Sequence, residues 1–263
     1  VAPRTGNVSA GTSIFSMVVL ENSLSKVYPE IDMVTTPTGK PVAMVHCNNC
    51  TSDINAWAGL FGEFAGALGI EASRGRILDL MFENAMKGDA DCGGLLSYNY
   101  FSGEPVTGLQ EGRPLFVRTP DAKLNLGNFM RTQLYSALAA LKVGLDLLLK
   151  NEKAAIDKIY GHGGFYIYPG VGQKITAAAI DAPVSVMKTA GEGGPYGMAL
   201  LSLYSVKGQG LSLEEFLEKK AFVDAETVTE NPDKNDVEGF NIFLERYVRG
   251  LECEKAAVGS IVN

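Results

Sequence analysis

The sequence predicts a single α/β domain, 1–263, with a mixed sheet flanked by helices. Strand-like runs open the chain and are followed by units of helix, strand and turn, an order typical of α/β domains. Residues 156–204 contain the pattern of strand, glycine-rich turn and helix twice. Because the pattern is continuous and no linker interrupts it, we expect one domain.

The composition is that of a globular protein with little affinity for polyanions. Hydrophobic residues make up 46% of the chain and the mean hydropathy is +0.06, enough apolar material for a large core. The net charge of −7 and the pI of about 5.0 disfavour nucleic acid and anionic membranes as partners. We find no signal peptide and no apolar run long enough to span a bilayer. A cytoplasmic protein is therefore expected.

Residues 7–20 form two strand-like runs that are interrupted by Gly11-Thr12-Ser13. Glycine permits a tight turn, and the hydroxyls with successive backbone N–H groups suit a phosphate oxygen. An ordinary hairpin with a polar tip is the alternative. A turn-rich stretch, 21–40, precedes a short strand at 42–46.

Cys47-Asn48-Asn49-Cys50 resembles a redox or zinc motif. A zinc site needs four ligands, but Cys92 and Cys253 are solitary and distant in the sequence. Four cysteines in a chain of this length are also too few for a disulfide scaffold. We therefore expect buried or loop-packed thiols and no metal site, and keep the metal or redox module as an alternative.

Apolar residues at three- and four-residue steps predict several amphipathic helices. One starts at Thr51 or Ser52 and continues to Leu68, and another is expected at 76–87. After a strand at 95–101 and a loop at 102–120, Asn128 is predicted to cap a long core helix. Later helices are expected after the capping box formed by Ser212 and Glu215 and after Pro232, with a short strand at 227–229 between them.

The two glycine-rich turns of 156–204 suit a phosphate or nucleotide, because glycine lets backbone amides approach a ligand closely. A strand ending at Ile159-Tyr160 leads into the turn 161–164, and Pro169 is predicted to open a helix that reaches Ile180. The second strand, 184–187, leads into 191–195 and a helix at 197–204. The glycine spacing matches neither the Rossmann fingerprint nor the P-loop, so a nucleotide would be held differently.

Taken in order, these motifs resemble the C-terminal half of the FGGY family of carbohydrate kinases. The resemblance rests on Ser9-Ala10-Gly11-Thr12-Ser13, the long helix from Phe129, Gly161-His162-Gly163-Gly164 and the small-residue helix at 197–201. It covers nearly the whole chain. It implies a ribonuclease-H-like domain of the actin-like ATPase superfamily.

The resemblance also implies site residues, with ATP and Mg²⁺ as cofactors. Gly11, Thr12 and Ser13 would contact the terminal phosphates of ATP. The adenosine would be held by the residues that match the family's glycine-rich loop and neighbouring helix: Gly163, Gly164, Phe165 and Asn55.

The sequence departs from the family pattern in three places. His162 interrupts the run of glycines, and bulky Phe165 and Tyr166 follow it. The arginine that commonly follows the glutamate of one family loop is missing after Glu104. No acidic residue lies between Val1 and Ser13, so the general-base aspartate of the family is expected upstream of Val1, together with the N-terminal sugar-binding domain.

We therefore expect the ATP-binding half of a kinase that phosphorylates a sugar such as a ketopentose, xylulose or ribulose for example. Alone it would be inactive, because phosphoryl transfer requires donor, metal and acceptor to be positioned together. The alternatives are an actin-like or chaperone-like ATPase domain and a module built on Cys47 and Cys50. A homodimer is possible, because missing inter-domain packing would leave an apolar face.

Overall fold

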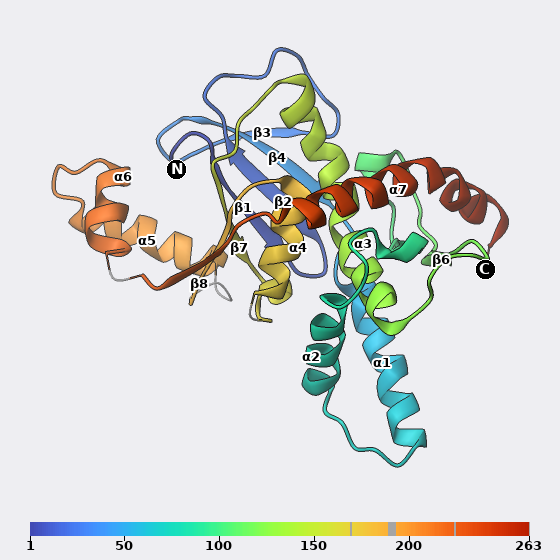
Figure 1. Ribbon diagram of the computed structural model, residues 1–263. Coiled ribbons are helices and arrows are strands. Elements are labelled where there is room, and N and C mark those ends of the chain that lie inside the picture. Colours follow the sequence, from blue (N-terminus) through green and yellow to red (C-terminus); the bar gives the residue numbers. More distant parts are fainter. Residues whose placement is uncertain (169, 189–192, 224, 263) are drawn as a thin grey trace.

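A seven-stranded mixed sheet lies at the centre of the computed structural model, which describes residues 1–168, 170–188, 193–223 and 225–262 (Figure 1). The strand order is β3-β4-β2-β1-β7-β8-β9, in which β7 runs parallel to both β1 and β8 and the other neighbours are antiparallel. The strands are β1 (Thr5–Ala10), β2 (Ile14–Val19), β3 (Asp32–Thr35), β4 (Pro41–Cys47), β7 (Lys158–His162), β8 (Val184–Met187) and β9 (Thr227–Glu230). The mixed sheet predicted from the order of elements is confirmed.

Most strands lie where the sequence predicts them. The runs in 7–20 form the antiparallel hairpin of β1 and β2, and β8 has the predicted bounds. Strand β7 continues past its predicted end, because its parallel pairing with β1 takes in Gly161 and His162. The sequence analysis missed β3, whose four residues are all exposed and therefore give no periodic signal. It also missed β6 (Leu115–Val117), which pairs with β5 (Leu96–Tyr98) in a separate small sheet.

The helices surround this sheet (Figure 1). They are α1 (Ser52–Ala67), α2 (Arg74–Ala85), α3 (Leu126–Asp146), α4 (Val171–Ile180), α5 (Gly193–Lys207), α6 (Leu213–Phe216) and α7 (Lys234–Ser260). The capping box of α6 is confirmed, since Ser212 Oγ accepts from Glu215 N at 3.2 Å and Ser212 N donates to the Glu215 carboxylate at 3.1 Å. Pro169, predicted to open a helix, lies outside the described residues, as do Gly191 and Glu192 of the second predicted turn.

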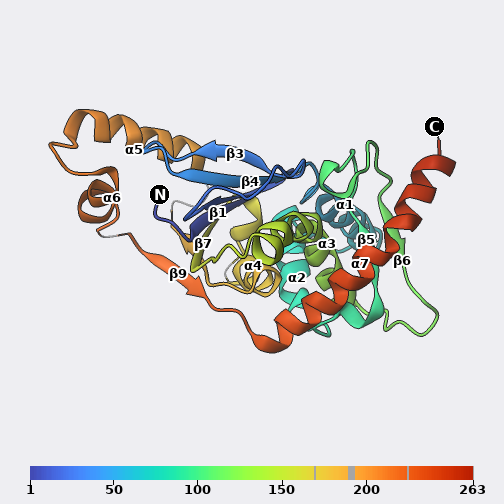
Figure 2. The ribbon, with the colours of Figure 1, turned by 90° about the horizontal axis from the view of Figure 1, so that it is seen from above.

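The two faces of the sheet are covered differently. Val8 and Ala10 of β1 are fully buried on the face against which α3 and α4 pack. Figure 2 shows α5 and α6 on the opposite side. There the alternate residues of β1, Asn7 and Ser9, are only half-buried. The apolar core therefore lies between the sheet and α3 and α4, and the second face is more open.

Helix α3 is the core helix of the domain. Its apolar stripe was predicted, and nearly every residue from Asn128 to Leu145 is buried. By length and composition alone the segment Leu126–Asn151 could cross a membrane, so the expectation that no run is long enough was wrong. However, 78% of its most apolar window is buried inside the protein. Burial in the core accounts for its apolar character.

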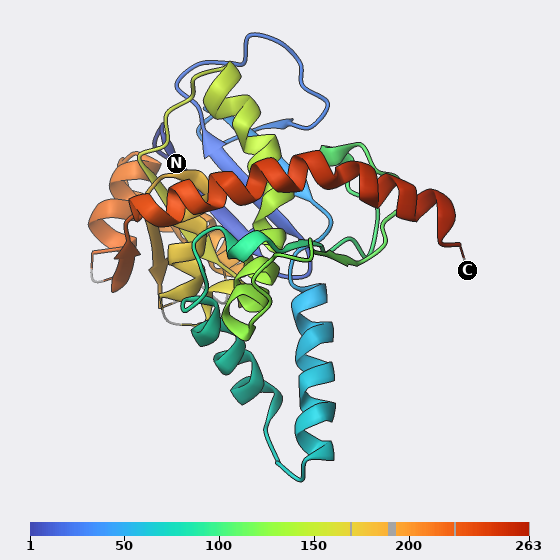
Figure 3. The ribbon, with the colours of Figure 1, turned by 45° about the vertical axis from the view of Figure 1, so that its right-hand side comes forward.

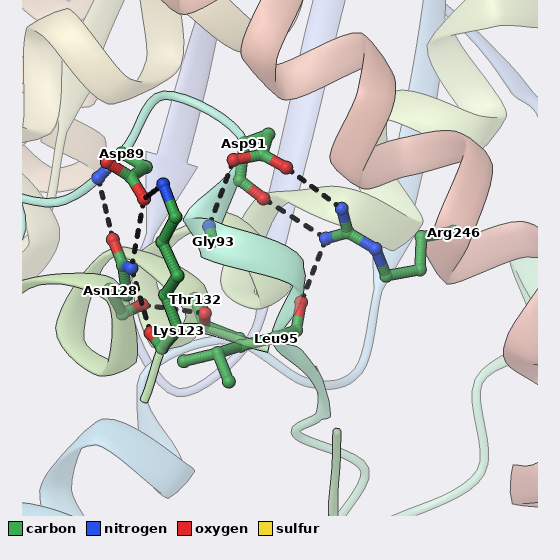
Figure 4. A network of polar contacts seen from close by, with 8 residues as sticks. All are labelled: Asp89, Asp91, Gly93, Leu95, Lys123, Asn128, Thr132 and Arg246. Carbon is green, nitrogen blue, oxygen red and sulfur yellow. Dashed lines mark hydrogen bonds and ion pairs between the residues drawn. The ribbon is translucent and has the colours of Figure 1, made fainter. Parts of the chain in front are cut away.

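The N-cap of α3 is Asn125, not Asn128 as predicted. The Asn125 side chain accepts a hydrogen bond from Asn128 N at 2.9 Å. Asn128 itself is fully buried and holds the neighbouring loop, because its Oδ1 accepts from Asp89 N at 2.6 Å (Figure 4). The same loop is fixed to α7 by Asp91, which pairs with Arg246 at 3.1 Å.

Helices α1 and α2 project from the body of the domain as an arm (Figure 3). Only Asp53, Ile54 and Ala58 of α1 are buried. Leu60 and Phe64 are 51% and 64% exposed on the arm. The base of the arm, by contrast, reaches the ends of the central strands, since Thr51 N donates to Gly11 O at 3.1 Å.

Candidate functional site

The two turns singled out in the sequence lie at the same edge of the sheet. Strands β1 and β7 are parallel neighbours, with Ser9 opposite His162, so the turns after both strands emerge side by side. Gly163 has φ +97°, and a Cβ added there would lie 2.5 Å from Ala10 O. Only glycine fits so close to the first turn in this backbone conformation.

The turn Gly11–Ser13 is held from below by the start of α1. Gly11 O accepts from Thr51 N at 3.1 Å and from Thr51 Oγ1 at 2.8 Å, and Thr12 O accepts from Cys50 N at 3.0 Å. These bonds fix the carbonyl groups toward the protein and leave the Thr12 side chain exposed. A turn of this kind offers hydroxyl and amide donors to an anion.

The glycine-rich turn after β7 has free space beside Gly164, whereas the next residue, Phe165, is buried. A Cβ added at Gly164 would meet nothing within 4 Å, so there is free space beside this residue. Phe165, which the resemblance placed against the base or ribose, has a fully buried side chain. Its ring lies 5.7 Å from that of Phe82 and 5.6 Å from that of Tyr166. In this structure Phe165 anchors the loop to the core and does not face the free space.

Arg74, which the sequence analysis did not single out, contacts the candidate residue Asn55. Its Nη2 lies 2.9 Å from Asn55 Oδ1 and 3.4 Å from Asn55 O, and the side chain is exposed. Its charge also acts on Tyr168, where it lowers the pKa of a phenol that burial raises. The ring of Tyr168 stacks on Phe82 with a centroid distance of 4.0 Å. No sequence spacing reports this meeting of α2 with the start of α1.

Three predicted regions meet at this edge of the domain. Gly163 lies against Ala10 beside the turn that begins at Gly11, and Gly11 O accepts from Thr51 N, one helical turn before Asn55. Asn55 Oδ1 in turn accepts a hydrogen bond from Arg74.

Asp53 is a buried carboxyl group at the start of helix α1, two residues after Thr51, which contacts the Gly11–Ser13 turn. Burial raises its pKa from 3.8 to about 6, against the opposing effect of the hydrogen bond from Trp57 Nε1 at 3.2 Å. The charged form of Asp53 is therefore disfavoured below about pH 6.

The cysteines of the Cys-x-x-Cys motif are free and buried. Burial raises the pKa of both thiols, and Glu104 raises that of Cys47 further. Such thiols are poor nucleophiles and poor metal ligands, since both roles require the thiolate. In the part of the chain that the structure describes, no group of three or more His, Cys, Asp or Glu residues is arranged to hold a metal ion. Nothing in this geometry supports the metal or redox alternative.

An α/β domain with two glycine-containing turns side by side at the ends of parallel strands has the architecture in which α/β proteins commonly bind ligands at the strand ends. Residues 6–206 match the family model of the FGGY family of carbohydrate kinases, C-terminal domain. The chain therefore belongs to this family. A comparison of the sequence with curated proteins found no match.

Solved structures of carbohydrate kinases share the fold. A gluconate kinase from Lactobacillus acidophilus superposes with a TM-score of 0.73 and 17% identity over 98% of this chain. A ligand-bound xylulose kinase from the same organism gives 0.72 and 18% over 98%. A glycerol kinase from Plasmodium falciparum, solved with ADP, gives 0.66 and 14% over 98%. The chain spans about half the length of these proteins, 48%, 48% and 47% respectively. The predicted ribonuclease-H-like, actin-like ATPase fold is confirmed.

Proposed function

We propose that this chain is the ATP-binding half of a sugar kinase, which transfers the γ-phosphate of ATP to a sugar hydroxyl. The observation that carries the proposal is the position of Gly163 against Ala10, which brings the two turns side by side at the edge where we place the nucleotide groove. Family membership supplies the reaction class. The substrate class is a ketopentose such as xylulose or ribulose, in line with the xylulose kinases among the similar folds.

In this proposal the turn Gly11–Ser13 holds the terminal phosphates. The bonds from Thr51 and Cys50 fix the carbonyl groups of Gly11 and Thr12, so little ordering of the turn is required when the anion arrives at the hydroxyls of Thr12 and Ser13. The free space beside Gly164 would admit the flat purine, and Asn55, held by Arg74, would contribute a further contact to the adenosine. Phe165 supports this loop from the core.

The residues present do not form a protein site for Mg²⁺. Among the described residues no carboxylate cluster lies at the groove, and Asp53 is engaged by Trp57. The ion would be held by the phosphate oxygens of the nucleotide. We therefore assign no metal ligand to this chain.

The sugar and the general base belong to the other half of the parent protein. The base would be an aspartate upstream of Val1, since no acidic residue lies between Val1 and Ser13. The chain alone would bind ATP weakly and would not phosphorylate sugar, because donor and acceptor must be held together.

An ADP-release assay with a panel of ketopentoses, hexuloses, gluconate and glycerol tests this. We expect no turnover from the 263-residue chain and sugar-dependent turnover from the full-length parent. Turnover by the chain alone would contradict the divided site. Hydrolysis of ATP by the parent that no sugar stimulates would instead indicate an actin-like ATPase.

A further inference from the structure

Glu104 is a fully buried glutamate in the loop after β5, and the proposed function does not use it. A buried carboxylate is costly unless hydrogen bonds satisfy it, so its partners indicate what it does. One of its oxygens, Oε2, accepts from Asn48 N at 3.0 Å, from Asn49 N at 3.3 Å and from Asn49 Nδ2 at 3.1 Å. Burial raises the pKa of Glu104, and the hydrogen bonds from Asn49 and Asn48 oppose that rise. The carboxylate therefore serves a neighbouring stretch of backbone.

That stretch is the β4–α1 connection, residues 48–51. Its central residue, Asn49, is held a second time, because its Oδ1 accepts from Ser102 N at 3.0 Å and its Nδ2 donates to Ser102 O at 3.2 Å. Asn99 Nδ2 donates to Cys50 O at 2.9 Å. The segment that follows β5 therefore fixes the β4–α1 connection through both backbone and side chains.

The loop that carries Glu104 is itself well anchored. Glu104 N donates to Leu109 O at 2.7 Å, and Leu109 N donates back to Glu104 O at 3.1 Å. The hydroxyl of Tyr100 lies 3.0 Å from Thr107 Oγ1 and accepts from Tyr247 Oη of α7 at 2.6 Å. The loop therefore offers the carboxylate a fixed support.

The other side of the β4–α1 connection holds the first turn. Cys50 N donates to Thr12 O at 3.0 Å, and Thr51 N donates to Gly11 O at 3.1 Å. Glu104 therefore holds two residues that lie immediately before the donors on which the turn rests. A displacement of about 1 Å that starts far from a reacting group can cost on the order of 100-fold in function.

We propose that Glu104 is a positioning residue for the phosphates of ATP, because it fixes the β4–α1 connection and, through it, the turn Gly11–Ser13. This inference rests on the proposed function. Glu104 is fully buried and acts through Asn48 and Asn49, without contact to the nucleotide. Its loss should reduce the part of the affinity that the terminal phosphates supply and leave the contribution of the adenosine unchanged.

Mant-ATP and mant-AMP, fluorescent analogues that do and do not carry the terminal phosphates, separate these two contributions in the full-length parent. Glu104→Leu removes the acceptor and should weaken mant-ATP about tenfold, as expected for loss of charge-assisted hydrogen bonds. It should change mant-AMP less than about twofold, because that analogue lacks the groups that the turn contacts. Glu104→Gln keeps one oxygen acceptor and should hold mant-ATP within about threefold of the wild type.

Glu254→Leu is the matched control. Glu254 is also fully buried, and its Oε1 accepts a backbone hydrogen bond from Arg113 N at 2.6 Å, but it lies on α7 and does not contact the β4–α1 connection. Its loss should lower stability without changing the ratio of the two dissociation constants. A merely structural role of Glu104 would leave this ratio unchanged as well, since unfolding affects both analogues equally.

Amide hydrogen exchange of the 263-residue chain gives a second measurement that needs no ligand. The N–H groups of Cys50 and Thr51 should exchange about tenfold faster in Glu104→Leu and be unchanged in Glu254→Leu. Circular dichroism checks the fold of each variant. Asn49→Ala, which removes only the side-chain bonds of the connection, takes the place of Glu104→Leu in both measurements if the latter does not fold.

The inference is overturned if the wild-type parent binds mant-ATP and the ratio of dissociation constants is the same in Glu104→Leu, or if Glu254→Leu changes that ratio equally. Unchanged exchange at Cys50 and Thr51 would also overturn it. Failure of the wild-type parent to bind mant-ATP at all is a different result. It would contradict the proposed function and remove this inference with it.

Discussion

Gly163 lies against the carbonyl oxygen of Ala10, so that the glycine-rich turn after β7 touches the end of β1 immediately before Gly11. This single approach brings the two turns together. Each turn alone is compatible with an ordinary α/β protein, whereas two adjoining turns at the ends of parallel strands support the proposed nucleotide site.

Replacement of Gly163 by alanine should damage the groove and the fold. The added Cβ would meet Ala10 O at 2.5 Å, and φ +97° is unfavourable for any L-residue. Strain of this kind costs about 1–3 kcal/mol, which urea denaturation would measure. Gly164→Ala is the control, because its Cβ would meet nothing within 4 Å. Equal losses of stability in the two variants would show that the close approach does not matter.

Loss of the Arg74 guanidinium should weaken nucleotide binding if the proposed function holds. Arg74→Ala removes the hydrogen bonds that orient Asn55 and a cation at the edge of the groove. We expect a roughly tenfold rise in the dissociation constant of a fluorescent ADP analogue, as for one charge-assisted hydrogen bond. Arg76→Ala, on the same exposed turn of α2, should change it little.

The same binding experiment distinguishes failure of the proposed nucleotide site from failure of the proposed role of Arg74. Absence of binding by the wild type, with or without its other half, would count against the nucleotide site itself. Normal binding by the wild type and by Arg74→Ala would count only against the role of Arg74.

Asp53 should make stability depend on pH. Its pKa is raised in the folded state from 3.8 to about 6, so the folded protein keeps a proton that the unfolded chain has released between these values. The free energy of unfolding therefore contains a contribution that is present below about pH 4 and lost as pH rises to about 6. Asp53→Asn should be more stable than the wild type by about 2–3 kcal/mol at pH 8, with no difference near pH 3.5. Denaturation at both pH values measures this, and a pH-independent difference would contradict it.

The buried tyrosines that join α7 to the small sheet should contribute measurably to stability. Tyr247 is fully buried, its hydroxyl donates to Tyr100 Oη at 2.6 Å, and its carbonyl accepts from Tyr98 at 2.6 Å. Tyr247→Phe removes the first bond without creating a large cavity. It should lower the free energy of unfolding by about 1–2 kcal/mol. Tyr204→Phe, which removes a half-exposed bond to Leu211 O, should cost less when measured by the same denaturation. Equal costs would show that burial of the tyrosine network adds nothing.

Local patterns predicted most elements correctly, and the errors have physical causes. The strand 184–187 and the capping box of Ser212 were predicted in place, because alternation and capping are properties of a few neighbouring residues. Asn128 was a reasonable cap by residue type. However, the Asn128 side chain accepts a long-range hydrogen bond from Asp89 N, and Asn125 caps the helix instead. The exposed strand β3 carried no signal to find.

The candidate site residues divide in the same way. Gly11, Thr12, Ser13, Gly163 and Gly164 could be singled out as turn residues, because turns of this kind require small or hydroxylated residues at fixed positions. The direction of the Phe165 side chain could not be predicted, since it follows from packing against Phe82 on a distant helix. The contact of Arg74 with Asn55 could not be predicted either, because it joins two different helices.

The class of fold, the positions of the two turns and their glycines could be read from the amino-acid sequence, because periodicity and backbone freedom are local properties. Three relationships came from the folded structure: the two turns adjoin, Arg74 meets Asn55, and a pocket remains beneath α5. These relationships depend on which strands pair and which faces are buried, and such choices are made by residues far apart in the chain.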